Sequence, residues 1–156
     1  MPWLTVAAVF LLAVTSPCSL RAQAFVELGG QALVLARDPA VFAGGVHAAV
    51  RTTPRTRFMA TLSGGSLDGE ALGRAEGLGH FLLNPLDPSG VGLYGGGGLG
   101  WEFLEGSRGY VVLLLGLEGN PGGRSGWFLE GGWGGGARIS AGWRWRFRPE
   151  GWPRRR

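Results

Sequence analysis

The sequence predicts an all-β fold: an eight-stranded antiparallel up-and-down transmembrane β-barrel, preceded by a cleavable signal peptide. Three observations support this prediction. Residues 137–147 alternate strictly between apolar and polar positions, about eight alternating stretches follow one another along the chain, and no stretch after residue 24 shows a helical period. A period of two is typical of a strand, because successive side chains point to opposite faces.

Residues 137–147, ARISAGWRWRF, give the clearest pattern. One parity carries only apolar side chains, and the other carries the charges of Arg138, Arg144 and Arg146. A soluble sheet edge would poorly tolerate an outward pair such as Trp143 and Trp145. Lipid on one side and a polar lumen on the other accommodate both faces.

Composition indicates one folded domain. The chain has 156 residues, 45% of them hydrophobic and 17% charged, which argues against disorder despite its 31 glycines. The net charge of +4 could suggest nucleic acid. Most arginines, however, alternate with apolar neighbours instead of forming a patch, so we expect no nucleic-acid partner.

The first 24 residues resemble a secretory signal. The apolar run 3–14 is shorter than the about 20 residues that span a bilayer, and Ala22-Gln23-Ala24 forms an A-x-A cleavage site. Cleavage there would remove Cys18, the sole cysteine. The expected organisation is a signal peptide at 1–24, a barrel at 25–147 and a basic tail at 148–156.

Turn residues divide the barrel region into its strands. Arg37-Asp38-Pro39 and Thr53-Pro54 end the first two stretches, and prolines recur after the fourth and sixth. The expected strands are 25–36, 41–52, 55–63, 70–83, 91–103, 110–118, 126–133 and 137–147. The loops 63–69 and 104–109, at the end away from the termini, are expected to be short.

The alternation assigns the strand residues to two faces. Residues expected to face outward include Val26, Leu28, Val34, Phe42, Val46, Val50, Phe58, Leu62, Leu93, Leu99, Trp101, Phe103, Trp127, Leu129 and Trp133. Residues expected to face inward include Gln31, His47, Met59, Thr61, Tyr94 and Phe128.

Two strands alternate less clearly. In 70–83, leucines share a parity with Arg74, Glu76 and His80, and we place the charges inward. Residues 110–118 are apolar on both faces, and only Glu118 and Arg108 mark the polar side.

Glycine on the inward parity fits a narrow barrel. An eight-stranded barrel has room inside only for side chains. We therefore expect inward arginines and aromatic rings to fill the space left by Gly96, Gly98, Gly100, Gly132 and Gly142.

The last strand also carries a family resemblance. Ser140, Gly142, Trp145 and Phe147 follow the pattern polar, any, glycine, any, any, hydrophobic, any, aromatic, which resembles the terminal-strand assembly signal of bacterial outer-membrane β-barrels. Residues 25–147 as a whole look like the small OmpA/OmpX-type barrels. The tail after Phe147 departs from that pattern, because the family usually ends near this aromatic residue.

The resemblance implies a location and a set of partners. Such a protein would be exported to the outer membrane of a Gram-negative-type bacterium and inserted by the barrel-assembly machinery. It would contact outer-membrane lipid and lipopolysaccharide as a monomer, with a structural or surface-interaction role and without acting as a general diffusion pore.

Two groups of side chains are candidate functional residues. Charges that face the lumen can neutralise one another, whereas isolated buried charges are costly. The expected lumenal network is Glu27, Arg51, Arg57, Arg74, Glu76, Glu102, Glu118, Glu130, Arg138, Arg144 and Arg146. The expected lipid-interface aromatics are Trp101, Trp127, Trp133, Trp143 and Trp145.

Two other functions compete with this interpretation. An outer-membrane acyl hydrolase or acyltransferase would pair His47 or His80 with a serine such as Ser63, Ser66 or Ser140 and an acidic residue, but no local motif resembles those enzymes. An exported soluble β-barrel could instead bind a small apolar ligand, although outward tryptophans argue against it. We expect no cofactor and no metal site, since the expected mature chain has no cysteine and no pair of histidines at helical spacing.

Overall fold

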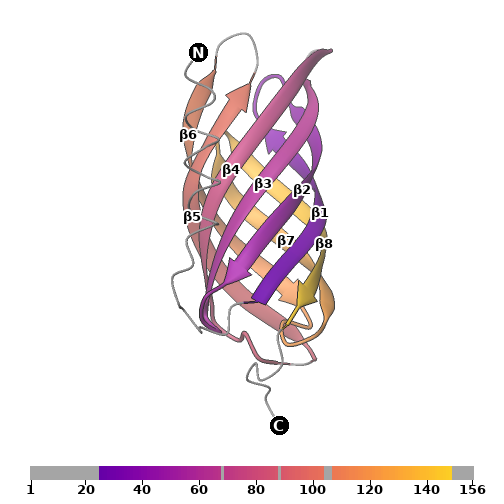
Figure 1. The fold of residues 1–156 in the computed structure, drawn as a ribbon. Coiled ribbons are helices and arrows are strands. Elements are labelled where there is room, and N and C mark those ends of the chain that lie inside the picture. Colours follow the sequence, from indigo (N-terminus) through magenta and orange to yellow (C-terminus); the bar gives the residue numbers. More distant parts are fainter. Residues whose placement is uncertain (1–24, 68, 88, 104–106, 149–156) are drawn as a thin grey trace.

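The computed structural model describes residues 25–67, 69–87, 89–103 and 107–148. The predicted signal peptide and all of the tail except Arg148 lie outside the described residues. The chain forms one closed barrel of eight strands, each paired with its sequence neighbours (Figure 1). The strands are β1 (Phe25–Ala36), β2 (Val41–Arg51), β3 (Thr56–Leu67), β4 (Glu70–Leu82), β5 (Val91–Phe103), β6 (Arg108–Gly119), β7 (Ser125–Gly134) and β8 (Ala137–Phe147).

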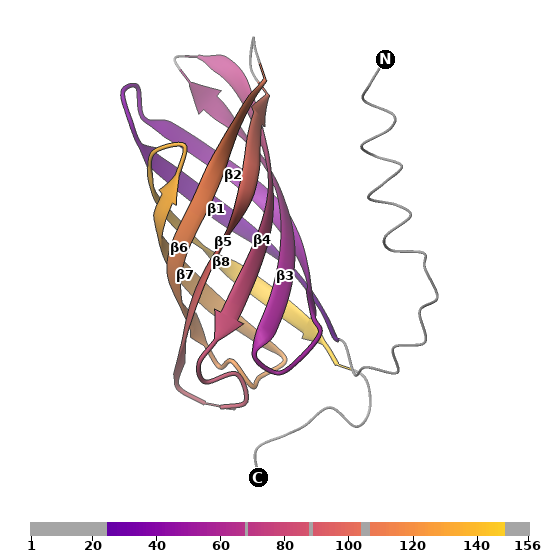
Figure 2. The same cartoon turned by 90° about the vertical axis from the view of Figure 1, so that its left-hand side faces the viewer.

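The barrel is antiparallel throughout and closes between its first and last strands. The closing ladder runs from the pair Val26 and Phe147 to the pair Ala36 and Ala137. Strands cross the barrel obliquely, and β1 begins at the end where β8 finishes (Figures 1 and 2). The predicted eight-stranded antiparallel up-and-down barrel is confirmed. None of the described residues forms a helix long and apolar enough to cross a membrane.

The strand bounds differ from the prediction mainly at β3 and β6. β3 continues beyond Ser63 to Leu67, because Gly64 pairs with Gly73 and Ser66 with Ala71 on β4. The segment 63–67 is therefore strand and not loop. β6 begins at Arg108, which pairs with Glu102 and is exposed at the barrel rim. The predicted ends of β2, β4 and β7 differ by one residue, and β8 has its predicted bounds.

Side chains separate into two faces as the alternation predicts. The leucines of β4 lie inside beside Arg74, Glu76 and His80, so the inward placement of this strand is confirmed. Two apolar clusters line the interior with the charges. One contains Ala49, Met59, Leu78, Leu82, Tyr94, Val112 and Leu114, and the other contains Leu33, Leu35, Val41, Ala43 and Leu72.

Glycines on the inner wall make room for rings on the next strand. Tyr94 lies directly opposite Gly116, and Tyr110 directly opposite Gly100. A Cβ atom at either glycine would overlap the facing ring. The same relation joins His47 to Gly29, His80 to Gly96 and Phe128 to Gly142. Aromatic side chains thus cover the backbone that glycine leaves bare.

The predicted role of the inward glycines is only partly correct. Gly96, Gly100 and Gly142 face rings, but a Cβ atom at Gly98 or Gly132 would meet the backbone of the neighbouring strand. None of these five glycines has an arginine side chain among its nearest atoms. Arginines lie instead over two other inward glycines, because Arg146 is close to Gly126 and Arg138 is close to Gly134.

Candidate functional site

The lumenal network lies wholly inside the barrel. Each of its eleven predicted members is at most 5% exposed. The charges fall into two groups along the barrel, one nearer the termini and one nearer the opposite mouth. Every carboxylate in these groups has at least one guanidinium within ion-pair distance.

The group near the termini centres on Glu118. Its Oε2 atom lies 2.9 Å from Nη1 of Arg57, 3.0 Å from Nη1 of Arg144 and 3.3 Å from Nη2 of Arg146. Its Oε1 atom lies 3.1 Å from Nη2 of Arg51. These five side chains come from β2, β3, β6 and β8, so one carboxylate links strands around the barrel.

Two further carboxylates complete this group. Glu27 on β1 lies 2.5 Å from Nε of Arg51 and 3.3 Å from Nη1 of Arg57. Glu130 on β7 accepts hydrogen bonds from the hydroxyls of Tyr94 at 2.7 Å and Ser140 at 2.9 Å. Hydrogen bonds of this kind offset the cost of burying a charge.

The second group centres on Glu76. Both of its carboxylate oxygens accept hydrogen bonds at 2.9 Å from Nη1 of Arg138, and the Tyr110 hydroxyl donates another at 2.9 Å. Arg74 contacts Glu76 at 3.2 Å and also pairs with Glu102. This group therefore joins β4, β5, β6 and β8.

The sequence prediction missed one member of the second group. Arg37, in the turn after β1, reaches Glu102 on β5 with an ion pair of 3.0 Å. The residues Asp38 and Pro39 that follow it predict a turn. Alternation along the chain could have indicated its inward direction, because Arg37 follows the buried residues Leu33 and Leu35 at a spacing of two.

Arginine exceeds glutamate in the interior, and aromatic rings stabilise part of the excess. Ion pairs among the described residues join five glutamates to seven arginines. The guanidinium carbons of Arg57, Arg144 and Arg74 lie 4.7, 4.2 and 4.5 Å from the ring centres of Tyr94, Phe128 and Tyr110. Cation–π contacts of this kind are stronger where water is excluded.

Hydrogen bonds link a side chain and the turns at the end that carries the termini. Arg146 donates a hydrogen bond of 2.9 Å to the carbonyl of Asn120. The turn before β5 is tied to the turn before β7, because the amide of Gly122 donates to the carbonyl of Asp87 at 2.5 Å. At the opposite mouth, Arg37 and Glu102 link the first turn to β5.

Both histidines lie in the lumen but have different surroundings. Nδ1 of His80 lies 3.1 Å from Nε of Arg57 and must accept this hydrogen bond, because a guanidinium only donates. His47 meets Phe128 edge to face with ring centres 5.3 Å apart. Among the described residues, neither ring nitrogen of His47 has a hydrogen-bond partner.

The serines considered for catalysis do not join these histidines. Ser140 donates to Glu130, Ser63 accepts from Gln31 at 3.5 Å, and Ser66 is exposed on the outer wall. Within the described part of the chain, no hydrogen bond joins a serine to either histidine. In the same part, no three His, Cys, Asp or Glu side chains gather in a way that could hold a metal.

The outer wall carries no charge on any strand. Every outward-facing position of β1–β8 is apolar, glycine, serine or threonine. All five predicted aromatics point outward, with exposures from 39% for Trp127 to 61% for Trp133. Trp127, Trp143 and Trp145 lie toward the termini, and Trp101 and Trp133 lie toward the opposite mouth.

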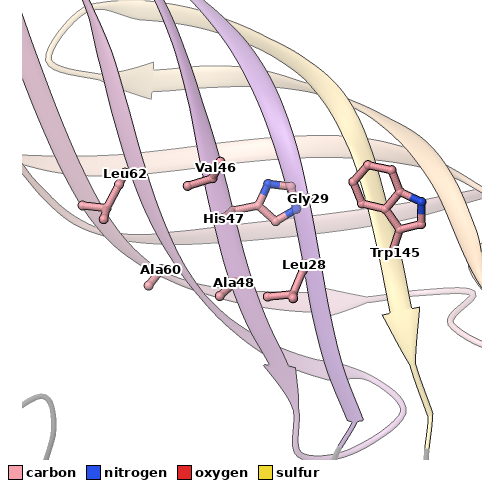
Figure 3. A pocket seen from close by; sticks show the side chains of 8 residues that line it. All are labelled: Leu28, Gly29, Val46, His47, Ala48, Ala60, Leu62 and Trp145. Atoms are coloured by element: carbon pink, nitrogen blue, oxygen red, sulfur yellow. The ribbon is translucent and has the colours of Figure 1, made fainter.

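Aliphatic side chains occupy the wall between these two aromatic belts. Leu115 is the most exposed of them at 74%, and Leu62, Leu113 and Ile139 are each more than 60% exposed. The wall also has an open depression of about 460 Å³ (Figure 3). Its lining residues are Leu28, Gly29, Val46, His47, Ala48, Ala60, Leu62 and Trp145.

The residues of the predicted assembly signal divide between the two faces of β8. Ser140 and Gly142 are on the inner parity, whereas Trp145 and Phe147 are exposed outside. Phe147 pairs with Val26 at the closing seam. The pattern therefore lies on the strand that completes the barrel.

No protein-family model and no curated protein matches the chain. Among solved structures, the barrel is similar to the solution structure of a de novo designed transmembrane β-barrel, TMB2.3, with a TM-score of 0.57 and 16% sequence identity. The alignment covers 83% of this chain and 100% of the designed one. At this identity, the similarity shows a shared barrel fold.

Proposed function

We propose that the protein spans the outer membrane of a Gram-negative-type bacterium and serves a structural or surface-interaction role. The observation that carries the proposal is the distribution of polarity across the barrel wall. The charged side chains of the strands point into the barrel. The outward positions form an uncharged aliphatic band between two aromatic belts. This distribution is typical of transmembrane barrels.

Contact between this apolar wall and water would be energetically unfavourable. Leu62, Leu113 and Leu115 are 63–74% exposed, and each Å² of apolar surface removed from water contributes about 25 cal/mol. Hydrocarbon would cover the band without a protein partner. The closed ladder also pairs the strand backbone, which lipid requires because it offers no hydrogen bonds.

The strands have the length that a bilayer requires. They contain 10–13 residues. At about 3.3 Å per residue and a tilt of about 45°, eleven residues rise about 26 Å, close to the apolar band of about 25 Å in outer-membrane barrels. We infer that the termini and the turns after β2, β4 and β6, which contain Pro54, Pro85 and Pro121, face the periplasm. We also infer that export uses the predicted signal peptide.

The closed interior favours a barrel that does not act as a diffusion pore. Glu118 and its arginines occupy the lumen near the termini, and Glu76 with its partners occupies it near the other mouth. Eight strands leave space only for such side chains. The inferred partners are outer-membrane lipid, lipopolysaccharide and, during insertion, the barrel-assembly machinery, with the mature protein as a monomer.

The two competing functions have less support. A soluble barrel that binds an apolar ligand needs an apolar internal cavity, whereas this interior is rich in ion pairs. A lipid-modifying enzyme needs a histidine that activates a serine, whereas His80 accepts from Arg57 and Ser140 donates to Glu130.

Membrane fractionation and gel mobility test the proposal. We expect the chain to partition with the outer membrane and to run at a different position on unheated detergent gels than after boiling, because a lipid-stabilised barrel resists unfolding. The comparison uses cells that lack the gene as a control. Recovery of the full chain in the soluble periplasmic fraction, without any heat-dependent shift, would refute it.

A further inference from the structure

The depression on the outer wall is built by two rows of paired residues. Trp145, Leu28, Ala48 and Ala60 form one row across β8, β1, β2 and β3, each residue opposite the next. The alanines are shorter than the side chains around them and form the floor. Val46 and Leu62, which pair with each other, stand at the side away from the termini (Figure 3).

The depression is an apolar surface that is open on its outer side. Its volume of about 460 Å³ is large enough for a hydrocarbon chain to lie against it. The side chains around it that point outward are aliphatic apart from the indole of Trp145. In a barrel within a membrane, a hydrocarbon chain is the ligand that such a surface accommodates.

A basic side chain lies on the turn beyond the depression, toward the termini. The outward pair Val50 and Phe58 stands between that turn and the row that contains Ala48 and Ala60. Ala48 and Ala60 are on the two strands joined by the β2–β3 turn, which contains the exposed residue Arg55. Within the described residues, no carboxylate pairs with Arg55. Two hydrogen bonds hold this turn. The Thr53 hydroxyl accepts one from the amide of Thr56 at 3.0 Å, and the carbonyl of Arg55 accepts one from the amide of Leu82 at 2.8 Å.

The end of the barrel near the termini is more basic than the opposite mouth. Its exposed and half-buried charged residues in the described chain are Arg55, Asp87, Arg124 and Arg148. At the opposite mouth, the described residues counted in the same way are Arg37, Asp38, Glu70 and Arg108. An anionic headgroup is therefore favoured at the end where the depression lies.

We propose that this depression is a binding site for one anionic phospholipid of the leaflet that meets the termini. The acyl chain lies over Ala48 and Ala60 against Trp145, and the headgroup phosphate meets the guanidinium of Arg55. Trp145 is suited to this place, because its ring contacts hydrocarbon and its N–H can donate to a polar headgroup. The inference rests on the proposed location in a membrane.

Native mass spectrometry of the full barrel can measure which lipids remain bound. The protein is reconstituted into vesicles of phosphatidylcholine mixed with phosphatidylglycerol and then extracted in mild detergent. We expect phosphatidylglycerol to be retained in preference to phosphatidylcholine. Arg55→Gln should lower that preference about fivefold, the effect of one basic side chain near an anionic lipid surface.

Matched variants separate a built site from general attraction. Ala48→Leu with Ala60→Leu fills the floor and should also remove the preference. Arg124→Gln removes another exposed charge at the same end, and Ala32→Leu enlarges another outward alanine, so both should leave the preference unchanged. An equal effect of Arg124→Gln, no effect of the double alanine variant, or stronger retention of added lipopolysaccharide would overturn the proposal.

A heat-dependent gel shift in pure phosphatidylcholine vesicles distinguishes the two possible failures. If the barrel inserts there but shows no preference for phosphatidylglycerol, the lipid site is wrong while the membrane location stands. If it does not insert into any vesicle, both proposals fail.

Discussion

The face of the barrel wall on which a glycine lies decides whether it can be replaced by a larger residue. Gly100 and Gly142 lie under the rings of Tyr110 and Phe128, whereas Gly77 has open space where its Cβ would be. The sequence shows the parity of each glycine but not its partner on the next strand. Inter-strand register decides which ring meets which glycine, so parity alone could not predict these pairs.

Replacing the inner glycines should therefore destabilise the barrel. Gly100→Ala or Gly142→Ala displaces a packed ring and should cost about 1–3 kcal/mol of the free energy of unfolding. The outward control Gly77→Ala should be neutral or stabilising by about 0.4–1 kcal/mol. Urea titration in lipid vesicles measures both, and equal effects of Gly100→Ala and Gly77→Ala would contradict the inferred ring contacts.

Glu118 is the residue on which most of the interior charge depends. Glu118→Gln leaves the guanidinium groups of Arg51, Arg57, Arg144 and Arg146 without their shared carboxylate, and removing one partner from a buried ion pair costs about 3–5 kcal/mol. Glu70→Gln, at an exposed rim position, should change stability by less than about 0.5 kcal/mol. Equilibrium unfolding of the two variants side by side would reveal whether the network supports the fold.

Strand faces were more predictable than strand ends. Alternation placed Phe58 outside and Arg57 inside correctly, because a period of two follows from backbone geometry. The end of β3 was placed too early, since Ser63, Gly64 and Gly65 are residues typical of turns. Pairing with β4 holds these residues in the ladder, and that long-range contact leaves no local signal.

The cost of placing a charge on the outer face of a strand should depend on its depth in the bilayer. Ala141→Arg puts a charge near the middle of β8 and should cost about 2–4 kcal/mol, whereas Ala36→Arg at the end of β1 should cost about 0–1 kcal/mol. Both alanines point outward and are exposed, so they form a matched pair. Urea titration in vesicles again supplies the values, and equal costs at the two depths would argue against a membrane-spanning wall.

The end of β8 should influence assembly more than final stability. Phe147 is 58% exposed and lies at the rim of the closing seam, so Phe147→Ala removes little packed surface. If the resemblance to the assembly signal holds, the variant should insert slowly in cells yet unfold at nearly the wild-type urea concentration. A normal insertion rate would show that β8 is recognised by other residues or that the tail after Phe147 alters recognition.

At the scale of the whole molecule, the barrel is closed as a ring, and buried charged side chains occupy its interior toward both ends. Arg146 meets the turn at Asn120 at one end, and Arg37 reaches Glu102 at the other. The sequence allowed a filled lumen to be predicted from inward charges. It did not indicate which charges would pair, because the pairs come from strands that are distant in sequence.

The side chains inside the barrel predict low ion conductance. Purified protein in planar bilayers should show no steady porin-like current, because side chains fill an eight-stranded interior. A larger porin incorporated in the same way serves as the positive control. Sustained single-channel conductance from the barrel would mean that the buried network opens in the membrane.

The pairing of β1 with β8 also constrains the order in which the protein can be completed. The first strand pairs with the last, so a partly formed sheet has two unpaired edges until β8 is in place. Contacts between such distant segments form slowly. A chain that stops before β8 would lack the strand that closes the ring. It would therefore remain an open sheet with unpaired edges, which would aggregate or be degraded.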